Sequence, residues 1–189
     1  MNTNEYLEEA RRDLENGRYQ EAISIYQMLI AENGEGKDTA AYCLGIICDG
    51  GIGVPTDPIA AERYYSMAEN GNQPLATYRL GKLLYRNGDA ARALTKFKKV
   101  AETNPSAAYW SYYILSTQNG ISAHHRAEKE LYLNSAANQG HLIAMRINAV
   151  RKMRGLEGIL KIPWGVIEYF ALTPKIWKAV ARRDDFRYQ

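Results

Sequence analysis

The 189-residue sequence contains few cysteines, phenylalanines, prolines and histidines, and it has no long hydrophobic run. No apolar stretch reaches the roughly 18 residues that a membrane-spanning helix requires, so we expect no conventional transmembrane segment. Fifteen glycines and six prolines exclude a collagenous or low-complexity chain. Residues 1–14 are acidic and have no basic stretch followed by an apolar one, so they do not predict a secretory signal.

The only two cysteines, Cys43 and Cys48, lie five residues apart within one helical pattern. This spacing fits neither a CxxC metal or redox motif nor a local disulfide bond. Reduced, structural thiols are the rule in the cytoplasm. We therefore expect a cytoplasmic protein, with peripheral contact to the inner membrane as the alternative location.

The motifs that carry most enzyme chemistry are also missing. The glycines of residues 45–53 lack the Gly-Lys-Ser/Thr of a phosphate-binding loop and lie between two helical patterns. No Gly-x-Ser-x-Gly elbow occurs. His124, His125 and His141 have no i, i+4 partner and no nearby cysteine, which argues against a metal site. The sequence thus predicts a protein that is not an enzyme and that has no catalytic residues, metal or cofactor.

The net charge of +3 hides an asymmetry along the chain. Residues 1–35 contain eight acids and three arginines, whereas residues 141–189 contain ten Lys or Arg and four acids. Charge runs are usually solvated faces, so solubility is the simplest explanation. No recognised nucleic-acid motif accompanies the basic residues and the isoelectric point is only about 8.8, so we expect no nucleic acid partner.

What the sequence does contain is a repeat of about 34 residues. Small or apolar residues recur in helical patterns at Ala10, Gly45, Gly81, Leu115 and Ala149, with spacings of 35, 36, 34 and 34. Within each unit a glycine-bearing turn separates two helical patterns. A single helix pair cannot bury its apolar stripe, so such pairs stack on one another. The repeat therefore predicts a helix, a turn and a helix per unit.

Individual residues within the units match a known pattern. The third unit has a helix-packing pair, a turn glycine, an alanine, an aromatic residue and a terminating proline at Leu80, Gly81, Gly88, Ala93, Phe97 and Pro105. The second unit has a longer glycine-rich turn at residues 50–55. The chain resembles the tetratricopeptide and Sel-one-like repeat families over about residues 3–152. The resemblance implies an all-α solenoid of about four stacked antiparallel helix pairs with a C-terminal helical extension.

The resemblance also implies where a partner binds. In these families the first helices line the concave surface and hold an extended peptide or a partner helix. By register, the partner-binding residues are Tyr42, Tyr78, Lys82, Tyr85, Arg86, Tyr109 and Tyr112. Stacked tyrosines offer large, rigid contact area with a hydroxyl each. The alternative is that these tyrosines pack between neighbouring helices, and the sequence does not choose between the two.

Residues 155–189 lie outside the resemblance and are rich in large apolar side chains, so we divide the chain into a repeat array of residues 1–154 and this C-terminal segment. Residues 142–153 are expected to begin a cap, without a second repeat helix after them. Pro163 and Pro174 are expected to split the segment into short helices, with Thr173 as an N-cap and a basic amphipathic helix after it. The expected interaction residues are Trp164, Phe170, Ile176, Trp177 and Val180.

Three roles remain open for the C-terminal segment. It caps the last repeat or fills the groove, it forms a homo-oligomer or partner interface, or it lies on an anionic membrane surface. The function predicted first is a bacterial, cytoplasmic scaffold or adaptor that binds a protein or peptide. The alternative is a membrane-surface accessory or regulatory subunit, for example of envelope or polysaccharide machinery, tethered by the C-terminal segment.

Overall fold

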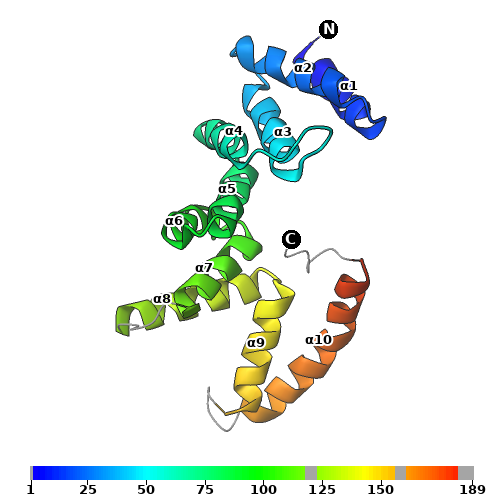
Figure 1. Ribbon diagram of the computed structural model, residues 1–189. Helices are drawn as coiled ribbons and strands as arrows, with labels where there is room; N and C mark the ends of the chain where they lie inside the picture. Colours follow the sequence, from blue (N-terminus) through cyan, green and yellow to red (C-terminus); the bar gives the residue numbers. More distant parts are fainter. Residues whose placement is uncertain (1, 118–122, 156–160, 183–189) are drawn as a thin grey trace. The chain divides into compact units, whose positions relative to one another are not determined.

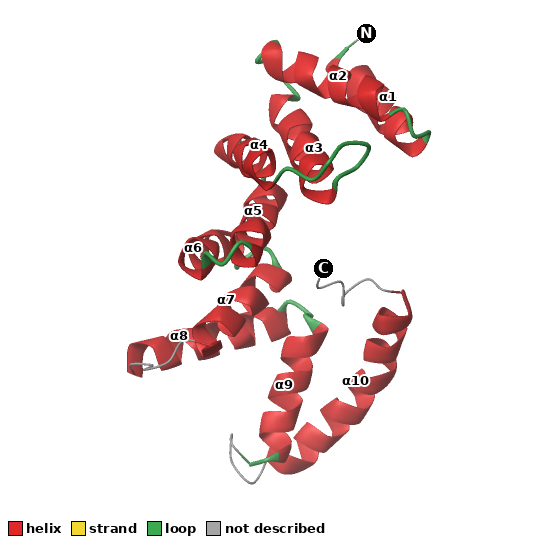
Figure 2. Cartoon of the chain, viewed as in Figure 1, coloured by secondary structure: helices red, strands yellow, loops and turns green. Residues whose placement is uncertain are grey.

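The computed structural model describes residues 2–117, 123–155 and 161–182. These residues form ten α-helices and no strand (Figures 1 and 2). In chain order the helices are α1 (Thr3–Glu15), α2 (Tyr19–Ala31), α3 (Lys37–Gly50), α4 (Pro58–Asn70), α5 (Pro74–Arg86), α6 (Ala90–Val100), α7 (Pro105–Thr117), α8 (Ala123–Asn138), α9 (Leu142–Met153) and α10 (Ile162–Arg182). The predicted all-α fold is confirmed.

The chain divides into two compact units, residues 1–99 and 100–189. In the first unit α1 packs on α2 and α3 on α4, and the contacts of α2 with α3 and of α4 with α5 stack successive pairs. In the second unit α7 packs on α8, α8 on α9 and α9 on α10. Each unit is thus built from consecutive helix pairs, as the repeat predicts.

Local sequence signals fix where the helices begin and end. Asn2 forms a capping box with Glu5 at the start of α1, so two otherwise unpaired backbone N–H groups are satisfied. Asp57 caps α4 by accepting hydrogen bonds from two backbone N–H groups, and Pro58 follows it at the first helical position. Gly51 ends α3 in the left-handed conformation, with φ of 65°, which glycine adopts without strain.

In the core, small residues on one helix pack against large side chains from the next helix. Ala10, Ala22, Ala40 and Ala61 are fully buried in the first unit. Small side chains let the helix backbones approach closely, and the aromatic residues Tyr65 and Phe97 fill the remaining space. Gly45 and Gly81 belong to the same contacts, because they lie directly against Tyr65 and Phe97.

The C-terminal segment differs from its prediction. α10 is one helix that continues through Pro174, and Thr173 does not cap a second helix because its hydroxyl donates a 3.0 Å hydrogen bond to the carbonyl of Tyr169. Packing on α9 favours one continuous helix: Gly165 and the buried Leu172 lie against α9 before the proline, and Lys175 after it lines the same cleft beside α9. Pro174 then removes one backbone hydrogen bond without ending the helix.

The predicted C-terminal helical extension is present. It is α10, which packs along α9. The boundary that we placed after residue 154 falls between these two helices of the same unit. That residues 1–154 act as the repeat array and residues 155–189 as a separate cap or interaction segment stays a prediction. Along the described residues, no helix is both long enough and apolar enough to cross a bilayer.

Candidate partner-binding site

The seven predicted partner-binding residues lie on first helices of their pairs. Tyr42 is on α3, and Tyr78, Lys82, Tyr85 and Arg86 are on α5, all in the first unit. The remaining two, Tyr109 and Tyr112, are on α7 in the second unit. The structure thus provides two separate groups, which we describe in turn.

The aromatic rings of the first group contact the second helix of their own pair. Tyr42 lies 6.3 Å from the ring of Tyr65 on α4, and Tyr78 lies 5.9 Å from the ring of Phe97 on α6, measured between ring centroids. Both tyrosines are half-buried. Each ring therefore contributes to packing within its pair while keeping part of its surface open to solvent.

Positive charge is concentrated on α5. Arg79, Lys82 and Arg86 follow one another at i, i+3 and i+7 and so share one face of the helix; we call them the α5 cation cluster. Asp49 on α3 forms an ion pair with Arg86 and accepts a 3.3 Å hydrogen bond from the hydroxyl of Tyr65. Its carboxylate is therefore already engaged.

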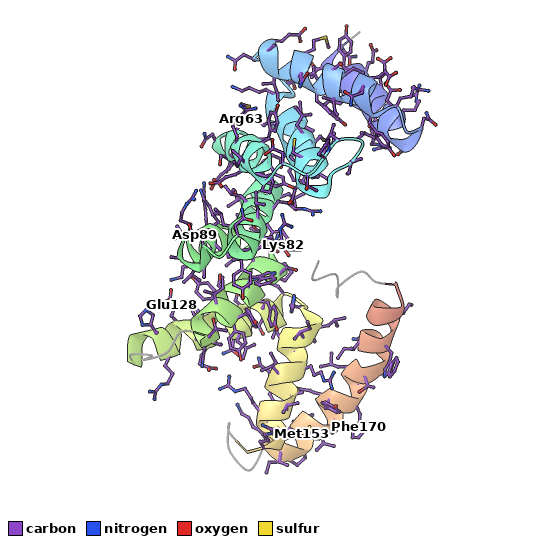
Figure 3. All side chains as sticks on the ribbon, in the orientation of Figure 1. Arg63, Lys82, Asp89, Glu128, Met153 and Phe170 are labelled. Atoms are coloured by element: carbon purple, nitrogen blue, oxygen red, sulfur yellow. The ribbon has the colours of Figure 1, made fainter. Side chains whose placement is uncertain are left out.

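Lys82, which is labelled on α5 in Figure 3, stands between Arg79 and Arg86 along the helix and is half-buried. Burial lowers its pKa, the neighbouring Arg79 and Arg86 lower it further, and Asp49 acts in the opposite direction. Considering all residues that the structure describes, neither Lys82 nor Arg79 takes part in an ion pair. The cluster is a local excess of positive charge that an external anion would neutralise.

The second group lies around α7. The ring of Tyr109 stacks on the ring of His141 with centroids 4.5 Å apart and an interplanar angle of 17°. His141 caps α9, because its Nδ1 accepts a hydrogen bond from the backbone N–H of Ala144. Tyr109 therefore stabilises the start of α9, a packing role that the sequence pattern did not reveal.

Tyr112 lines a cleft of about 470 Å³ formed with α8 and α9. The cleft has an apolar floor of Ile143, Ile147 and Val150. Its polar lining is Lys129, Glu130, Arg146, Arg151 and Arg154. Arg151 forms an ion pair with Glu130, so the one acid of the lining is engaged. Sequence reasoning found only Tyr112 here; the late excess of basic residues was the signal for the rest.

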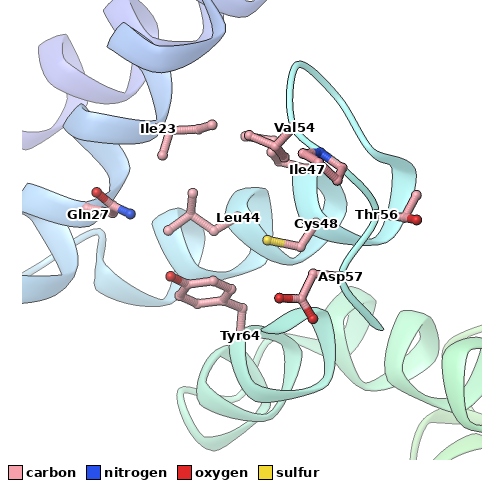
Figure 4. A pocket seen from close by; sticks show the side chains of 10 residues that line it. Ile23, Gln27, Leu44, Ile47, Cys48, Val54, Thr56, Asp57 and Tyr64 are labelled. Carbon is pink, nitrogen blue, oxygen red and sulfur yellow. The ribbon is translucent and has the colours of Figure 1, made fainter. Parts of the chain in front are cut away.

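A second cleft, of about 460 Å³, lies between α2, α3, α4 and the loop of residues 51–57. Figure 4 shows Ile23 of α2, Leu44 and Cys48 of α3, and Tyr64 of α4 around it. Burial and the nearby Asp57 raise the pKa of Cys48, and burial raises the pKa of Cys43. Both thiols are free and protonated at neutral pH, so they are weak nucleophiles.

The predicted C-terminal residues have different environments. Trp164, Phe170 and Trp177 expose 65%, 66% and 71% of their surface, whereas Ile176 is half-buried. The side chain of Val180 lies outside the described residues. Over the described ranges, no group of three or more His, Cys, Asp or Glu side chains has the arrangement of a metal site.

Comparisons with known proteins agree with this architecture. A family model described as tetratricopeptide repeat matches residues 75–107. A solved structure of a Sel1 repeat protein from Oxalobacter formigenes superposes with a TM-score of 0.70 at 26% sequence identity, covering 89% of this chain and 69% of that chain. A search of curated proteins gave no match.

The stacked helix pairs and these similarities define the class of protein as an α-solenoid. Residues 75–107 match the tetratricopeptide repeat model, and the fold is similar to that of a Sel1 repeat protein. Repeats of this fold generally mediate protein–protein interaction and generally are not enzymes. The resemblance predicted from the sequence is therefore confirmed.

Proposed function

We propose that this protein is a non-enzymatic scaffold whose α3 and α5 surface binds an acidic peptide segment of a partner protein. The observation that carries the proposal is the half-buried Lys82, which has Arg79 and Arg86 beside it and forms no ion pair with any described residue. A carboxylate of a bound peptide supplies the missing negative charge. Charge-assisted hydrogen bonds of this kind contribute roughly 1.5–3 kcal/mol each.

The tyrosines of the same surface supply the apolar part of the binding site. Tyr42 and Tyr78 are fixed by their ring contacts with the second helices, so they lose little conformational freedom when a partner covers them. Tyr85 stands one residue before Arg86 on α5 and is half-buried. An extended peptide with acidic and apolar side chains matches this combination of rigid rings and cations.

The cleft beside Tyr112 has the same chemistry in the second unit. Lys129, Arg146 and Arg154 bring three cations beyond the Arg151–Glu130 pair to an apolar floor. We propose that this cleft accepts a second acidic and apolar segment. Tyr109 supports it indirectly, because its stacking on His141 positions the start of α9.

The cellular setting belongs to the same proposal. Half-buried, protonated cysteine thiols without a disulfide are suited to a reducing cytoplasm. The similarity to a protein of Oxalobacter formigenes favours a bacterial adaptor. A tethered accessory subunit of envelope machinery is the alternative, and the exposed apolar residues of α10 favour it; their role is argued below.

The proposal is tested by fluorescence anisotropy with two labelled synthetic peptides of equal length and apolar content, one rich in Glu and one rich in Lys. The Glu-rich peptide is expected to bind and the Lys-rich peptide is not. Lys82→Gln is expected to weaken binding about tenfold, which corresponds to one charge-assisted contact. Arg12→Gln removes an exposed cation from α1 and is the matched control, with no effect expected.

Affinity capture with the wild-type chain and the Lys82→Gln variant then identifies the natural partner. The partner captured by the wild type and lost by the variant is expected to contain an acidic segment. Equal binding of both peptides, or full binding by Lys82→Gln, would exclude the α5 cation cluster as the site.

A further inference from the structure

One side of α10 is apolar and exposed, and none of the described helices packs on it. At 100° per residue, the residues of this side fall within one arc about 100° wide. They are Val166, Ile167, Phe170, Pro174 and Trp177, and each is exposed; we call this the α10 outer stripe. Phe170 is labelled on α10 in Figure 3. Large exposed apolar patches mark interaction surfaces.

The opposite side of the same helix is held by α9. Gly165 is buried against the α9 backbone, Leu172 is buried, and Lys152 of α9 donates hydrogen bonds of 2.7 and 2.8 Å to the carboxylate of Glu168. Arg146 of α9 lies over the ring of Tyr169 and donates a hydrogen bond to its hydroxyl. The outer stripe is therefore presented by a fixed helix.

Positive charge follows one border of the stripe. Lys175 and Lys178 are exposed there, and in the described part of the chain neither takes part in an ion pair. Trp164 is exposed beside them on the same border. The acid of α10, Glu168, is already paired with Lys152. The outer surface of α10 thus combines aromatic rings with uncompensated cations.

We infer that α10 docks on an anionic lipid surface, with the outer stripe in the headgroup region and Lys175 and Lys178 against the lipid phosphates. Tryptophan has an apolar body and a polar N–H, which suits the boundary between headgroups and hydrocarbon. A helix with one apolar face and flanking lysines lies in the plane of the interface and does not span the bilayer. This agrees with the finding that no described helix could cross a membrane.

Charge decides between lipid and a second copy of the chain. If two outer stripes paired, each copy would bring Lys175 and Lys178 to a surface whose acid, Glu168, is already occupied. The lysines would then remain uncompensated, whereas an anionic bilayer neutralises them. The inference is independent of the α5 cation cluster, which lies in the other unit.

The test is binding of the full-length protein to vesicles of phosphatidylglycerol with phosphatidylcholine, and to vesicles of phosphatidylcholine alone, at low salt. Sedimentation with the anionic vesicles only is expected, together with a blue shift of tryptophan emission. Trp110 is buried, so the shift reports Trp164 and Trp177. The double variant Lys175→Gln, Lys178→Gln is expected to bind about 25-fold more weakly, since each lysine near an anionic surface contributes roughly fivefold.

Trp177→Ser is expected to remove most of the blue shift and to weaken sedimentation. The matched controls are Leu131→Ser, which removes an exposed apolar side chain from α8, and Arg126→Gln, which removes an exposed cation from the same helix. Both should bind as the wild type does. Circular dichroism checks that each variant keeps its helicity.

Two results would overturn the inference. The first is the absence of binding to anionic vesicles at low salt, where electrostatic attraction is strongest. The second is a dimer in light scattering that Trp177→Ser converts to a monomer without any vesicle binding, which would assign the stripe to a second copy. If the wild-type protein binds the Glu-rich peptide but not the anionic vesicles, the lipid inference is rejected and the proposed peptide binding is not.

Discussion

Gly81 of α5 lies so close to Phe97 of α6 that a Cβ atom on Gly81 would be 2.8 Å from Cε1 of the ring. The preceding repeat has the same arrangement, since a Cβ on Gly45 would be 2.5 Å from Cδ1 of Tyr65. A glycine on the first helix and an aromatic ring on the second therefore form the recurring contact of these two pairs, and this contact sets how closely the helices approach.

Gly81→Val is expected to destabilise the first unit by about 1–3 kcal/mol, because a buried ring must move to admit the larger side chain. Thermal and urea unfolding followed by circular dichroism measure the change. Gly34→Ala is the control, since a Cβ there has no neighbour within 4 Å. A stability equal to that of the wild type would show that the contact is not tight.

Gly165→Ala is expected to loosen α10 from α9. A Cβ on Gly165 would lie 2.5 Å from the backbone nitrogen of Met153 and 2.8 Å from the carbonyl oxygen of Ala149. Backbone atoms cannot rotate away as a side chain can, so even one methyl group is expected to cost about 1–3 kcal/mol. Hydrogen exchange should rise in α10 while α1 to α4 keep their protection. Unchanged exchange in α10 would contradict the close approach.

The stability of the first unit is expected to depend on pH through Glu69. This carboxylate is buried and accepts hydrogen bonds of 2.6 Å from Lys96 and 3.1 Å from Lys99. Burial alone would raise its pKa, but the two lysines outweigh burial and hold the pKa below its ordinary value. A lowered pKa in the folded state stabilises the protein above the ordinary pKa of glutamate, and this stabilisation is lost as the pH falls through the lowered value.

Melting temperatures of the wild type and of Glu69→Gln, measured from neutral pH down to about pH 3, test this prediction. The variant should be less stable than the wild type at neutral pH, and the difference should shrink on acidification. A difference that is independent of pH would mean that Glu69 contributes through packing alone.

Two substitutions of Tyr78 separate packing from recognition. Tyr78→Phe keeps the ring that contacts Phe97, so we expect it to retain more stability than Tyr78→Ser and to bind the partner more weakly where the hydroxyl contacts the partner. Tyr78→Ser removes the ring and is expected to lower the melting temperature as well. Stability and binding are measured side by side on both variants. Full partner binding by Tyr78→Ser would support the packing alternative for this tyrosine.

The sequence was sufficient for the helix pairs because their signals are local. The 34-residue spacing and the helix-packing glycines, such as Gly45 and Gly81, recur at positions that the structure confirms as helix contacts. The course of α10 was not predictable in this way. Pro174 is a good first residue of a helix, yet α10 continues through it while packed along α9, with Gly165 and Leu172 against that helix.

The candidate site was predictable only in part. Register placed Lys82 and Arg86 on a first helix, and both lie on α5. The excess of positive charge could not be foreseen, because it depends on Asp49 of another helix being engaged by Arg86 and Tyr65. The packing roles of Tyr42 and Tyr109 likewise depend on rings that are distant in sequence.

Hydrogen exchange of the wild-type protein with and without the Glu-rich peptide shows whether the partner binds at the α5 cation cluster. We expect added protection in α3 and α5, around Tyr42 and Lys82, and loss of that protection in Lys82→Gln. Protection confined to α1 and α2, or protection in α5 that Lys82→Gln leaves unchanged, would contradict the claim that the α5 cation cluster binds the partner.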